Sequence, residues 1–188
     1  MKYFMKIGYI ICTILFINYL LIPNLKFPEK IDDSLTSNEP ADTEDIKRRA
    51  YFTNYKREEV IEYYIDQFKN NYFLHVVKLP TFRLNYPPEE AQIIIRDQTR
   101  STYLEEIVHP FRESIFINGF EPKDPKDTII IENKNWRQKI IVKAVNSNIY
   151  IRLLIGVITL LIIPYIYKSW IETINDFIKV LSKLWNFR

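Results

Sequence analysis

The sequence is poor in the residues that most catalytic and ligand-binding motifs require. Its 188 residues include three glycines, one cysteine and two histidines. Phosphate-binding loops need several glycines at fixed spacing, so they are nearly excluded. The single Cys12 excludes an intramolecular disulfide and a cysteine-based zinc site. No Gly-x-Ser-x-Gly elbow is present, and Ser101 and Ser114 lie in no recognisable nucleophile motif. We therefore expect no cofactor and no resident metal.

The chain also lacks a large excess of charge of either sign. Its 26 Lys and Arg residues and 23 Asp and Glu residues give a formal net charge of +3. Proteins that bind nucleic acid usually carry a basic patch or stripe. The charge balance therefore predicts that nucleic acid is not a partner.

The sequence does contain two long apolar runs, of which Leu153–Tyr167 is the clearer. That run carries no charge, and it begins at Ile149 if Arg152 is tolerated. A helix rises about 1.5 Å per residue, so residues 149–167 cover roughly 28 Å, close to the hydrocarbon thickness of a bilayer. We interpret residues 149–167 as a transmembrane helix.

The other run, Ile7–Ile22, follows Lys2 and Lys6. A basic head before an apolar run also describes a secretory signal peptide. No small-x-small cleavage site follows this run, and Cys12 lies inside it rather than at its end. Residues 1–25 are therefore predicted to be an uncleaved signal anchor.

Basic residues beside the spans indicate orientation. Lys2 and Lys6 favour a cytoplasmic N-terminus, so two spans place both chain ends inside and the intervening domain outside. Basic residues on the two sides of the second run are balanced, so that run favours neither orientation.

Between the spans the sequence predicts a flexible linker over residues 26–44 and a soluble α+β domain over residues 45–148. The linker is polar, contains Pro28 and Pro40, and shows almost no apolar periodicity. The domain is predicted to have two helices early and an antiparallel sheet later.

The helical half of the domain is read from apolar stripes. A strand over Arg49–Thr53 precedes a helix that Asn54 caps and that starts at Lys56. Its inward stripe comprises Val60, Ile61, Tyr64, Ile65 and Phe68. Tyr72–Lys78 is expected to be extended. A second helix starts at Pro87 and runs to about Gln98, with Ala91, Ile94 and Ile95 inward.

The sheet half is read from alternation and turn signals. Strands are expected over Thr102–His109 and Arg112–Asn118, with a turn at Asn118-Gly119. Thr128–Glu132 and Trp136–Val145 are expected to form a hairpin. In the second of these, Trp136, Gln138, Ile140, Val142 and Ala144 face one side and Arg137, Lys139 and Lys143 the other.

Residues 168–188 are predicted to be a C-terminal amphipathic helix. Its apolar stripe comprises Trp170, Ile171, Ile174, Phe177, Ile178, Leu181 and Trp185. Lying in the membrane interface, with Trp170, Phe177, Trp185 and Lys168 as interface residues, is one interpretation. Packing on a partner's helix is the alternative.

The densest polar cluster contains Glu105, Glu106, His109, Arg112 and Glu113. These side chains include an acid, a base and an anion-binding arginine, so they are the candidate catalytic residues. The spacing Glu105-x3-His109-x3-Glu113 would align three ligands on one face of a helix, but Pro110 lies inside that window. The alternative is that these charges pair with one another in a structural role.

Two polar residues lie in or near the spans. Asn18 and Arg152 are candidates for hydrogen bonds between the two helices. Arg152 is alternatively expected to extend to the lipid headgroups, which is the interpretation we favour from the sequence.

Arg83–Ala91, Arg96–Ser101, Tyr103–Ser114 and Asn118–Pro122 together resemble uncharacterised membrane-anchored proteins of reduced-genome bacteria. The resemblance covers roughly Tyr51–Val145 and the C-terminal span. It implies a bacterial inner (plasma) membrane protein with two spans and brings no activity, ligand or catalytic residue with it.

The expected function is non-catalytic: an interaction or scaffolding component of an envelope assembly, with membrane lipid and other envelope proteins as partners. Two alternatives remain open. One is a membrane-tethered envelope enzyme that uses His109 and a neighbouring glutamate as an acid–base pair. The other is an accessory subunit of a transporter that makes contact through its spans and tail.

Overall fold

The computed structural model describes the whole chain except residues 1, 44, 70–71, 74–76, 88–100 and 186–188. The chain divides into two compact units. The first, here called the helical unit, comprises residues 1–22 and 148–188. The second, here called the sheet domain, comprises residues 23–147.

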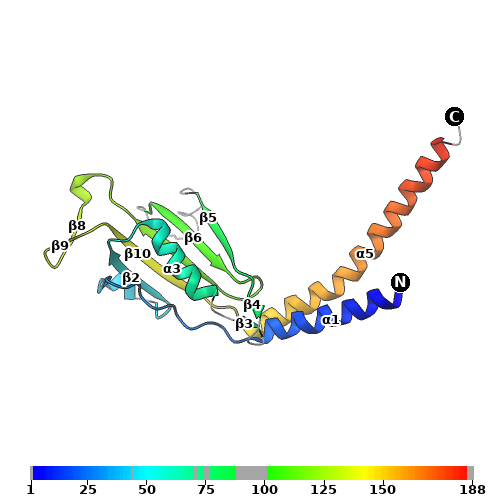
Figure 1. Cartoon of the computed structure of the whole chain (residues 1–188), viewed down its shortest axis with the longest axis horizontal. Coiled ribbons are helices and arrows are strands. Elements are labelled where there is room, and N and C mark those ends of the chain that lie inside the picture. Colours follow the sequence, from blue (N-terminus) through cyan, green and yellow to red (C-terminus); the bar gives the residue numbers. More distant parts are fainter. Residues whose placement is uncertain (1, 44, 70–71, 74–76, 88–100, 186–188) are drawn as a thin grey trace. The chain divides into compact units, whose positions relative to one another are not determined.

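The helical unit pairs helix α1 (Lys2–Leu21) with helix α5 (Ile149–Trp185), which lie side by side and antiparallel (Figure 1). Both helices are long and apolar enough to cross a membrane. Gly156 of α5 permits their close approach, because a Cβ atom there would lie 2.3 Å from Cδ1 of Leu20. Leu20 is 1% exposed.

Pro164 lies inside α5 without ending the helix. A proline has no N–H, so the carbonyl of the residue four positions earlier loses its helical donor. That residue is Leu160, and the hydroxyl of Tyr9 in α1 donates a hydrogen bond to its carbonyl oxygen. The helix pair therefore replaces the hydrogen bond that the proline removes.

Helix α5 continues unbroken for 37 residues. The sequence predicted a span at residues 149–167 and a separate amphipathic helix at 168–188, but no helix ends between residues 167 and 168. The sequence suggested two elements because its pattern changes at Lys168 from apolar to amphipathic, and both patterns are compatible with a single helix.

The sheet domain contains a six-stranded antiparallel sheet in the order β1-β2-β10-β7-β6-β5. Its strands are β1 (Leu35–Thr36), β2 (Arg48–Thr53), β5 (Phe82–Tyr86), β6 (Tyr103–Val108), β7 (Ser114–Phe120) and β10 (Gln138–Val145). With the helices, this confirms the predicted α+β class and the antiparallel sheet.

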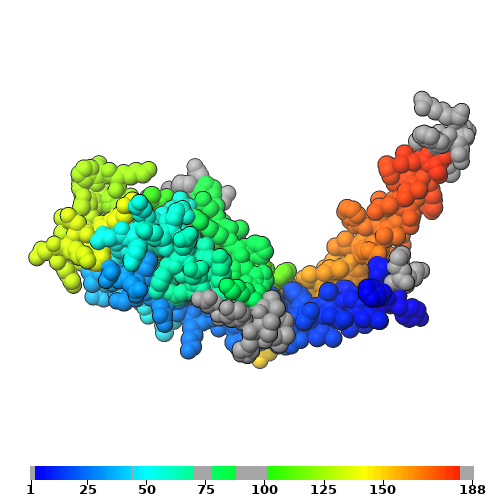
Figure 2. Space-filling model, viewed as in Figure 1, coloured from blue at the N-terminus to red at the C-terminus, as the bar shows by residue number. Residues whose placement is uncertain are grey.

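Helix α3 (Arg57–Lys69) packs on one face of this sheet (Figure 1), and its atoms, coloured cyan to blue-green, lie at the surface of the sheet domain in Figure 2. Four residues of its predicted stripe are buried and the fifth is partly buried; the buried four are Val60, Ile61, Tyr64 and Phe68. They share a core with strand residues that include Ile107, Ile117, Ile140 and Val142. The predicted alternation of β10 is also confirmed, because Gln138, Ile140 and Val142 are buried whereas Lys143 is exposed.

Four short elements complete the described part of the domain. They are helix α2 (Pro40–Thr43), the β3–β4 hairpin (Tyr72–Phe73 and Val77–Lys78), the 3-10 turn η1 (Pro125–Asp127) and the β8–β9 hairpin (Ile129–Ile131 and Lys134–Trp136). The segment predicted as one extended stretch, Tyr72–Lys78, therefore contributes two paired strands.

The segment predicted as a flexible linker, residues 26–44, is instead part of the domain. Ile31 is 3% exposed and belongs to the core, with Phe27 packed against it. Ser37 donates a 2.6 Å hydrogen bond to the carboxylate of Asp42, which also lies 2.7 Å from Nζ of Lys139. The prediction was wrong because a few anchoring side chains are enough to hold a segment on the domain, even where the segment has no helical or strand periodicity.

The predicted turn at Asn118-Gly119 is wrong, because both residues lie inside β7. Gly119 pairs with Tyr103 and with Ile140, and a Cβ at Gly119 would lie 2.1 Å from the Tyr103 ring. Glycine is therefore needed there for close side-chain packing rather than for a turn.

The predicted hairpin near residue 133 is present with a shorter second strand. Its turn residues Glu132 and Asn133 have φ values of 54° and 60°, as the favoured two-residue hairpin turns require. Lys134–Trp136 pairs with Ile129–Ile131, whereas the rest of the predicted strand joins the main sheet as β10.

In the helical half, two further details differ from the prediction, and a third lies outside the residues that the structure describes. Strand β5 was not predicted, although its sequence Phe82–Tyr86 alternates. Asn54 does not cap α3, because its side chain accepts a 2.9 Å hydrogen bond from the N–H of Arg137. The carboxylate of Glu59 instead accepts a hydrogen bond from the N–H of Lys56 at the start of the helix. The predicted second helix with Ala91, Ile94 and Ile95 falls among residues outside the description.

Candidate functional site

The five candidate catalytic residues lie on β6 and on the turn that follows it. Glu105 and Glu106 lie on opposite faces of β6, and His109, Arg112 and Glu113 lie on the turn. Strand β6 is extended, so residues 105 and 109 are separated by roughly 13 Å along the chain. The helical spacing that would align Glu105, His109 and Glu113 is therefore absent.

Glu105 is fully buried beneath helix α3. Its carboxylate accepts hydrogen bonds from Nε of Arg83 at 2.9 Å, from Nη2 of Arg83 at 3.0 Å and from Nη2 of Arg57. Arg83 also pairs with Glu58 of α3 at 3.1 Å. This ionic group connects α3, β5 and β6.

Electrostatics keep this carboxylate charged. Burial raises the pKa of Glu105, but the hydrogen bonds from Arg83 and Arg57 outweigh burial and leave the pKa below its ordinary value. Glu105 is therefore an ionised partner of two arginines at neutral pH, and a raised pKa, which a general acid would need, is not found.

The neighbouring polar side chains are also engaged internally. The guanidinium of Arg57 lies 4.9 Å from the ring centre of Tyr103. The Tyr103 hydroxyl donates a 2.9 Å hydrogen bond to Gln138, whose amide donates at 2.8 Å to the carbonyl of Tyr55. Burial raises the pKa of Tyr103, so the phenol stays neutral.

Glu106 points to the other face of the sheet, as alternation along a strand requires. There the hydroxyl of Tyr86 donates a hydrogen bond to its carboxylate. Glu105 and Glu106 are adjacent in sequence and cannot act on one substrate from the same side of the sheet.

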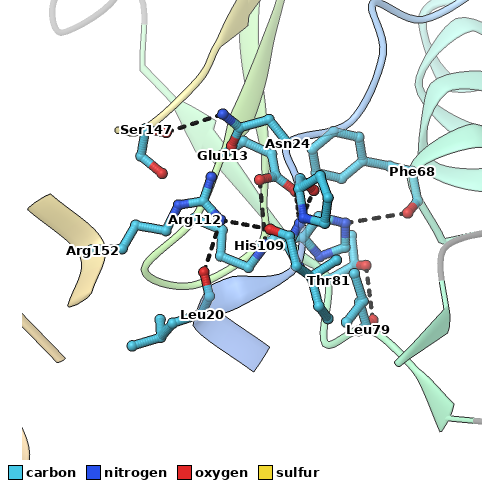
Figure 3. Close-up of polar contacts among 12 residues, drawn as sticks. Leu20, Asn24, Phe68, Leu79, Thr81, His109, Arg112, Glu113, Ser147 and Arg152 are labelled. Atoms are coloured by element: carbon cyan, nitrogen blue, oxygen red, sulfur yellow. Dashed lines mark hydrogen bonds and ion pairs between the residues drawn. The ribbon is translucent and has the colours of Figure 1, made fainter. Parts of the chain in front are cut away.

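His109 is fully buried just after β6 (Figure 3). Its Nδ1 lies 2.9 Å from the carbonyl oxygen of Pro80, and its Nε2 lies 3.2 Å from the carbonyl oxygen of Phe68. The imidazole stacks on the Phe68 ring with centres 4.4 Å apart and planes 11° apart. Both ring nitrogens therefore face backbone acceptors, which leaves neither nitrogen directed to a substrate.

Burial lowers the pKa of His109, and the two carbonyl contacts and Glu113 oppose that effect without cancelling it. The neutral ring has one N–H to donate, so at neutral pH one of the two carbonyls receives no hydrogen bond from it.

Arg112 and Glu113 form a buried ion pair, with Nη2 of Arg112 2.9 Å from Oε1 of Glu113. Arg112 also donates a 2.9 Å hydrogen bond to the carbonyl of Pro23 at the start of the domain. Nearby, the side-chain amide of Asn24 donates a 3.0 Å hydrogen bond to the carbonyl of Ser147. These bonds hold the first and last residues of the sheet domain next to each other.

Among the residues that the structure describes, no group of three or more His, Cys, Asp or Glu side chains is placed to hold a metal ion.

The residues predicted at a membrane interface lie on α5. Trp170 is 67% exposed and Phe177 is 63% exposed, and Lys168 lies 3.8 Å from Glu172 in an exposed pair. Trp185 is the last residue of α5, and its side chain is outside the description.

Arg152 is buried within the helical unit rather than extended to headgroups. Its Nη1 donates hydrogen bonds to the carbonyls of Leu20 at 3.2 Å and Ile22 at 2.9 Å, where α1 ends. The favoured interpretation from the sequence was therefore wrong, because the last carbonyls of a helix lack intrahelical donors and a guanidinium satisfies them. Asn18 bonds within its own helix, to the carbonyl of Ile14 at 2.8 Å.

Sequence reasoning missed Arg57 and Arg83 as partners of Glu105. A signal was available, because Glu105 lies two residues from Tyr103 and two from Ile107 on a predicted strand. Residues two apart share one face of a strand, so Glu105 had to face the core with them. A buried carboxylate needs a cationic partner, and the nearby arginines were the candidates.

Comparison of the chain with protein-family models, with curated protein sequences and with solved structures gives no match.

Proposed function

We propose that this protein is a two-span protein of a bacterial plasma membrane whose sheet domain is a non-catalytic interaction or scaffolding module of an envelope assembly. The observation that carries the proposal is the internal use of the candidate catalytic groups. Glu105 is enclosed by two arginines, His109 faces two backbone carbonyls, and Arg112 pairs with Glu113.

The membrane assignment is supported by the surface of the helical unit. Its exposed side chains are predominantly large and apolar, for example Leu154, Ile158 and Leu161 at 62%, 46% and 71% exposure. A continuous apolar surface of this kind is costly in water and favourable in a bilayer.

The orientation with both chain ends in the cytoplasm and the domain outside follows from Lys2 and Lys6. Reporter fusions after Asp42 and after Arg188 test it. An exported reporter should be active after Asp42 and inactive after Arg188; the reverse pattern would place the domain in the cytoplasm.

Purification in mild detergent tests the scaffolding role. The full chain should bring down a partner at constant stoichiometry, and a matched variant that lacks residues 25–146 should not. Recovery of a clean monomer of the full chain after crosslinking in the membrane would contradict the proposal.

The accessory-subunit alternative has one observation in its favour. The stripe on the second half of α5, with Trp170, Ile174, Phe177 and Leu181, is exposed along the described residues of an unbroken helix. Deletion of Trp170–Arg188 should then release the partner while the sheet domain stays folded, and retained association would count against this alternative.

The acid–base alternative has less support, since no nitrogen of His109 is directed to a substrate. His109→Ala should leave function intact at matched expression. Complete loss of function with normal expression would favour an enzyme.

A further inference from the structure

Exposed large apolar side chains of the sheet domain gather at one end of the sheet. Among the described residues 23–147, six such side chains are exposed: Ile46, Phe82, Leu84, Phe111, Ile130 and Val145. Four of them, Ile46, Phe82, Phe111 and Val145, lie at the same end and are called the apolar rim below.

Strand register establishes this placement. Phe82 pairs with Val108, Val108 with Ser114, and Ser114 with Val145, so these positions form one row across β5, β6, β7 and β10. Lys143 pairs with Arg48, which places Ile46 opposite Val145 when the register is continued, and the N–H of Ala144 bonds to the carbonyl of Lys47 at 2.9 Å. Phe111 lies in the turn that joins β6 to β7 beyond this row.

The rim is the end at which the chain enters and leaves the domain. Val145 ends β10, the carbonyl of Ser147 accepts the hydrogen bond from Asn24, and α5 begins at Ile149. An extended chain spans at most about 3.5 Å per residue, so Val145 lies within roughly 14 Å of Ile149.

The rim combines apolar exposure with a costly backbone conformation. Ile46 is 79% exposed and Phe111 is 48% exposed. Phe111 has a φ of 62°, a conformation that bulky residues rarely adopt and that glycine or asparagine adopts more readily. An aromatic residue at this position therefore indicates a use for its side chain.

We propose that the apolar rim of the sheet domain contacts the headgroup region of the bilayer that holds α1 and α5. Aromatic and aliphatic side chains are favourable at the boundary between headgroups and acyl chains. Lys143, exposed two residues before Val145 on the same face of β10, would lie just above the boundary and attract anionic lipid. This inference rests on the membrane anchoring proposed above.

Site-specific fluorescence quenching in nanodiscs of phosphatidylcholine and phosphatidylglycerol tests the inference with the full chain. Cys12→Ser provides the background, and single cysteines are introduced by Ile46→Cys and Phe111→Cys at the rim. Ile130→Cys in the β8–β9 hairpin is the matched exposed control, and Ile158→Cys reports the span. Each cysteine carries the same fluorophore, and lipids carry a nitroxide either on the headgroup or in the acyl chain.

Headgroup nitroxides should quench the labels at positions 46 and 111 several-fold more than the label at 130, and acyl-chain nitroxides should quench the label at 158. If positions 46 and 111 behave like 130 while 158 is quenched, the rim does not contact lipid and only this inference fails. If position 158 is not quenched either, the proposed membrane anchoring fails and the inference fails with it.

Discussion

At the residue scale, the ionisable side chains that first suggest catalysis are the ones that fasten the sheet domain together. Glu105 secures α3 and β5 to the sheet through two arginines, and Arg112 fastens the entry of the chain at Pro23. Polar residues of this kind are costly to bury unless they are paired, and here they are paired. In the structure they join α3, β5 and β6 to one another and the entry of the chain to the turn after β6.

Glu105→Gln should destabilise the sheet domain. The change leaves Arg57 and Arg83 without their buried counter-charge, and the expected cost is about 2 kcal/mol. Fully buried pairs lose more, but both arginines are about one third exposed. The midpoint of urea unfolding measures the loss. Glu106→Gln, on the other face, is the matched control and should cost about 1 kcal/mol or less; equal losses would refute the assignment.

His109 should make the stability of the domain depend on pH. Its pKa in the folded protein is lowered from 6.5, chiefly by burial, so the unfolded chain binds more protons near and below pH 6.5. Stability should be fully present above pH 6.5 and should fall as the pH decreases below that value. Glu113 and Arg112 are the charged groups that act on the ring, in opposite directions.

Urea unfolding at several pH values between 5 and 8 tests this prediction. His109→Gln should reduce the loss of stability on acidification, whereas His75→Gln is the histidine control. A wild-type stability that rises as the pH falls from 7 to 5.5 would show that the two carbonyl contacts favour the charged ring.

At the element scale, the helices of the helical unit depend on each other for hydrogen bonds. Arg152 of α5 satisfies carbonyls at the end of α1, and Tyr9 of α1 satisfies the carbonyl that Pro164 leaves without a donor in α5. Each bond favours the paired state of the helices, and in the bilayer proposed above no water is available to replace the Tyr9 hydroxyl at the carbonyl of Leu160.

Tyr9→Phe should weaken the pairing of α1 with α5 by about 1 kcal/mol, because the carbonyl oxygen of Leu160 loses its hydrogen-bond donor. In a Pro164→Ala background the restored N–H of residue 164 serves the same carbonyl, so the tyrosine change should then have little effect. Resonance energy transfer between labels on the two helices in nanodiscs measures the pairing in four proteins: the wild type, Tyr9→Phe, Pro164→Ala and the double variant. An equal effect of Tyr9→Phe in both backgrounds would exclude this account.

Prediction from the sequence succeeded where one periodic pattern determined an element. The stripe of α3 and the alternation of β10 are examples. It failed where a distant contact overrode a local signal: Gly119 is required by the Tyr103 ring, and the 26–44 segment is held by Ile31 and Asp42. The site residues were found as a cluster in sequence, but their partners Arg57 and Arg83 come from other elements, which sequence spacing alone does not reveal.

At the scale of the whole molecule, the chain is a helix pair into which a separately cored domain is inserted. The first and last residues of the domain are bound to each other through Asn24 and Ser147, and the buried core has contributions from segments across residues 31–142. A domain whose ends meet has the usual property of an independently folding unit.

A fragment of residues 23–147 should therefore fold without the helices. We expect cooperative urea unfolding and a circular dichroism spectrum with both helix and strand contributions. Asn24→Ala should lower the stability of this fragment by about 1 kcal/mol through loss of the bond to Ser147. A fragment that unfolds without a cooperative transition would show that the helices are needed for the fold.

Strand β10 is the last strand of the domain in sequence and lies inside the sheet, between β2 and β7. During synthesis, β2 and β7 therefore lack a common neighbour until residues 138–145 have been added. The next residues to appear begin α5 at Ile149. Closure of the sheet and synthesis of the second apolar helix thus fall in the same short interval of translation, so a pause before residue 138 would leave two strand edges open to aggregation.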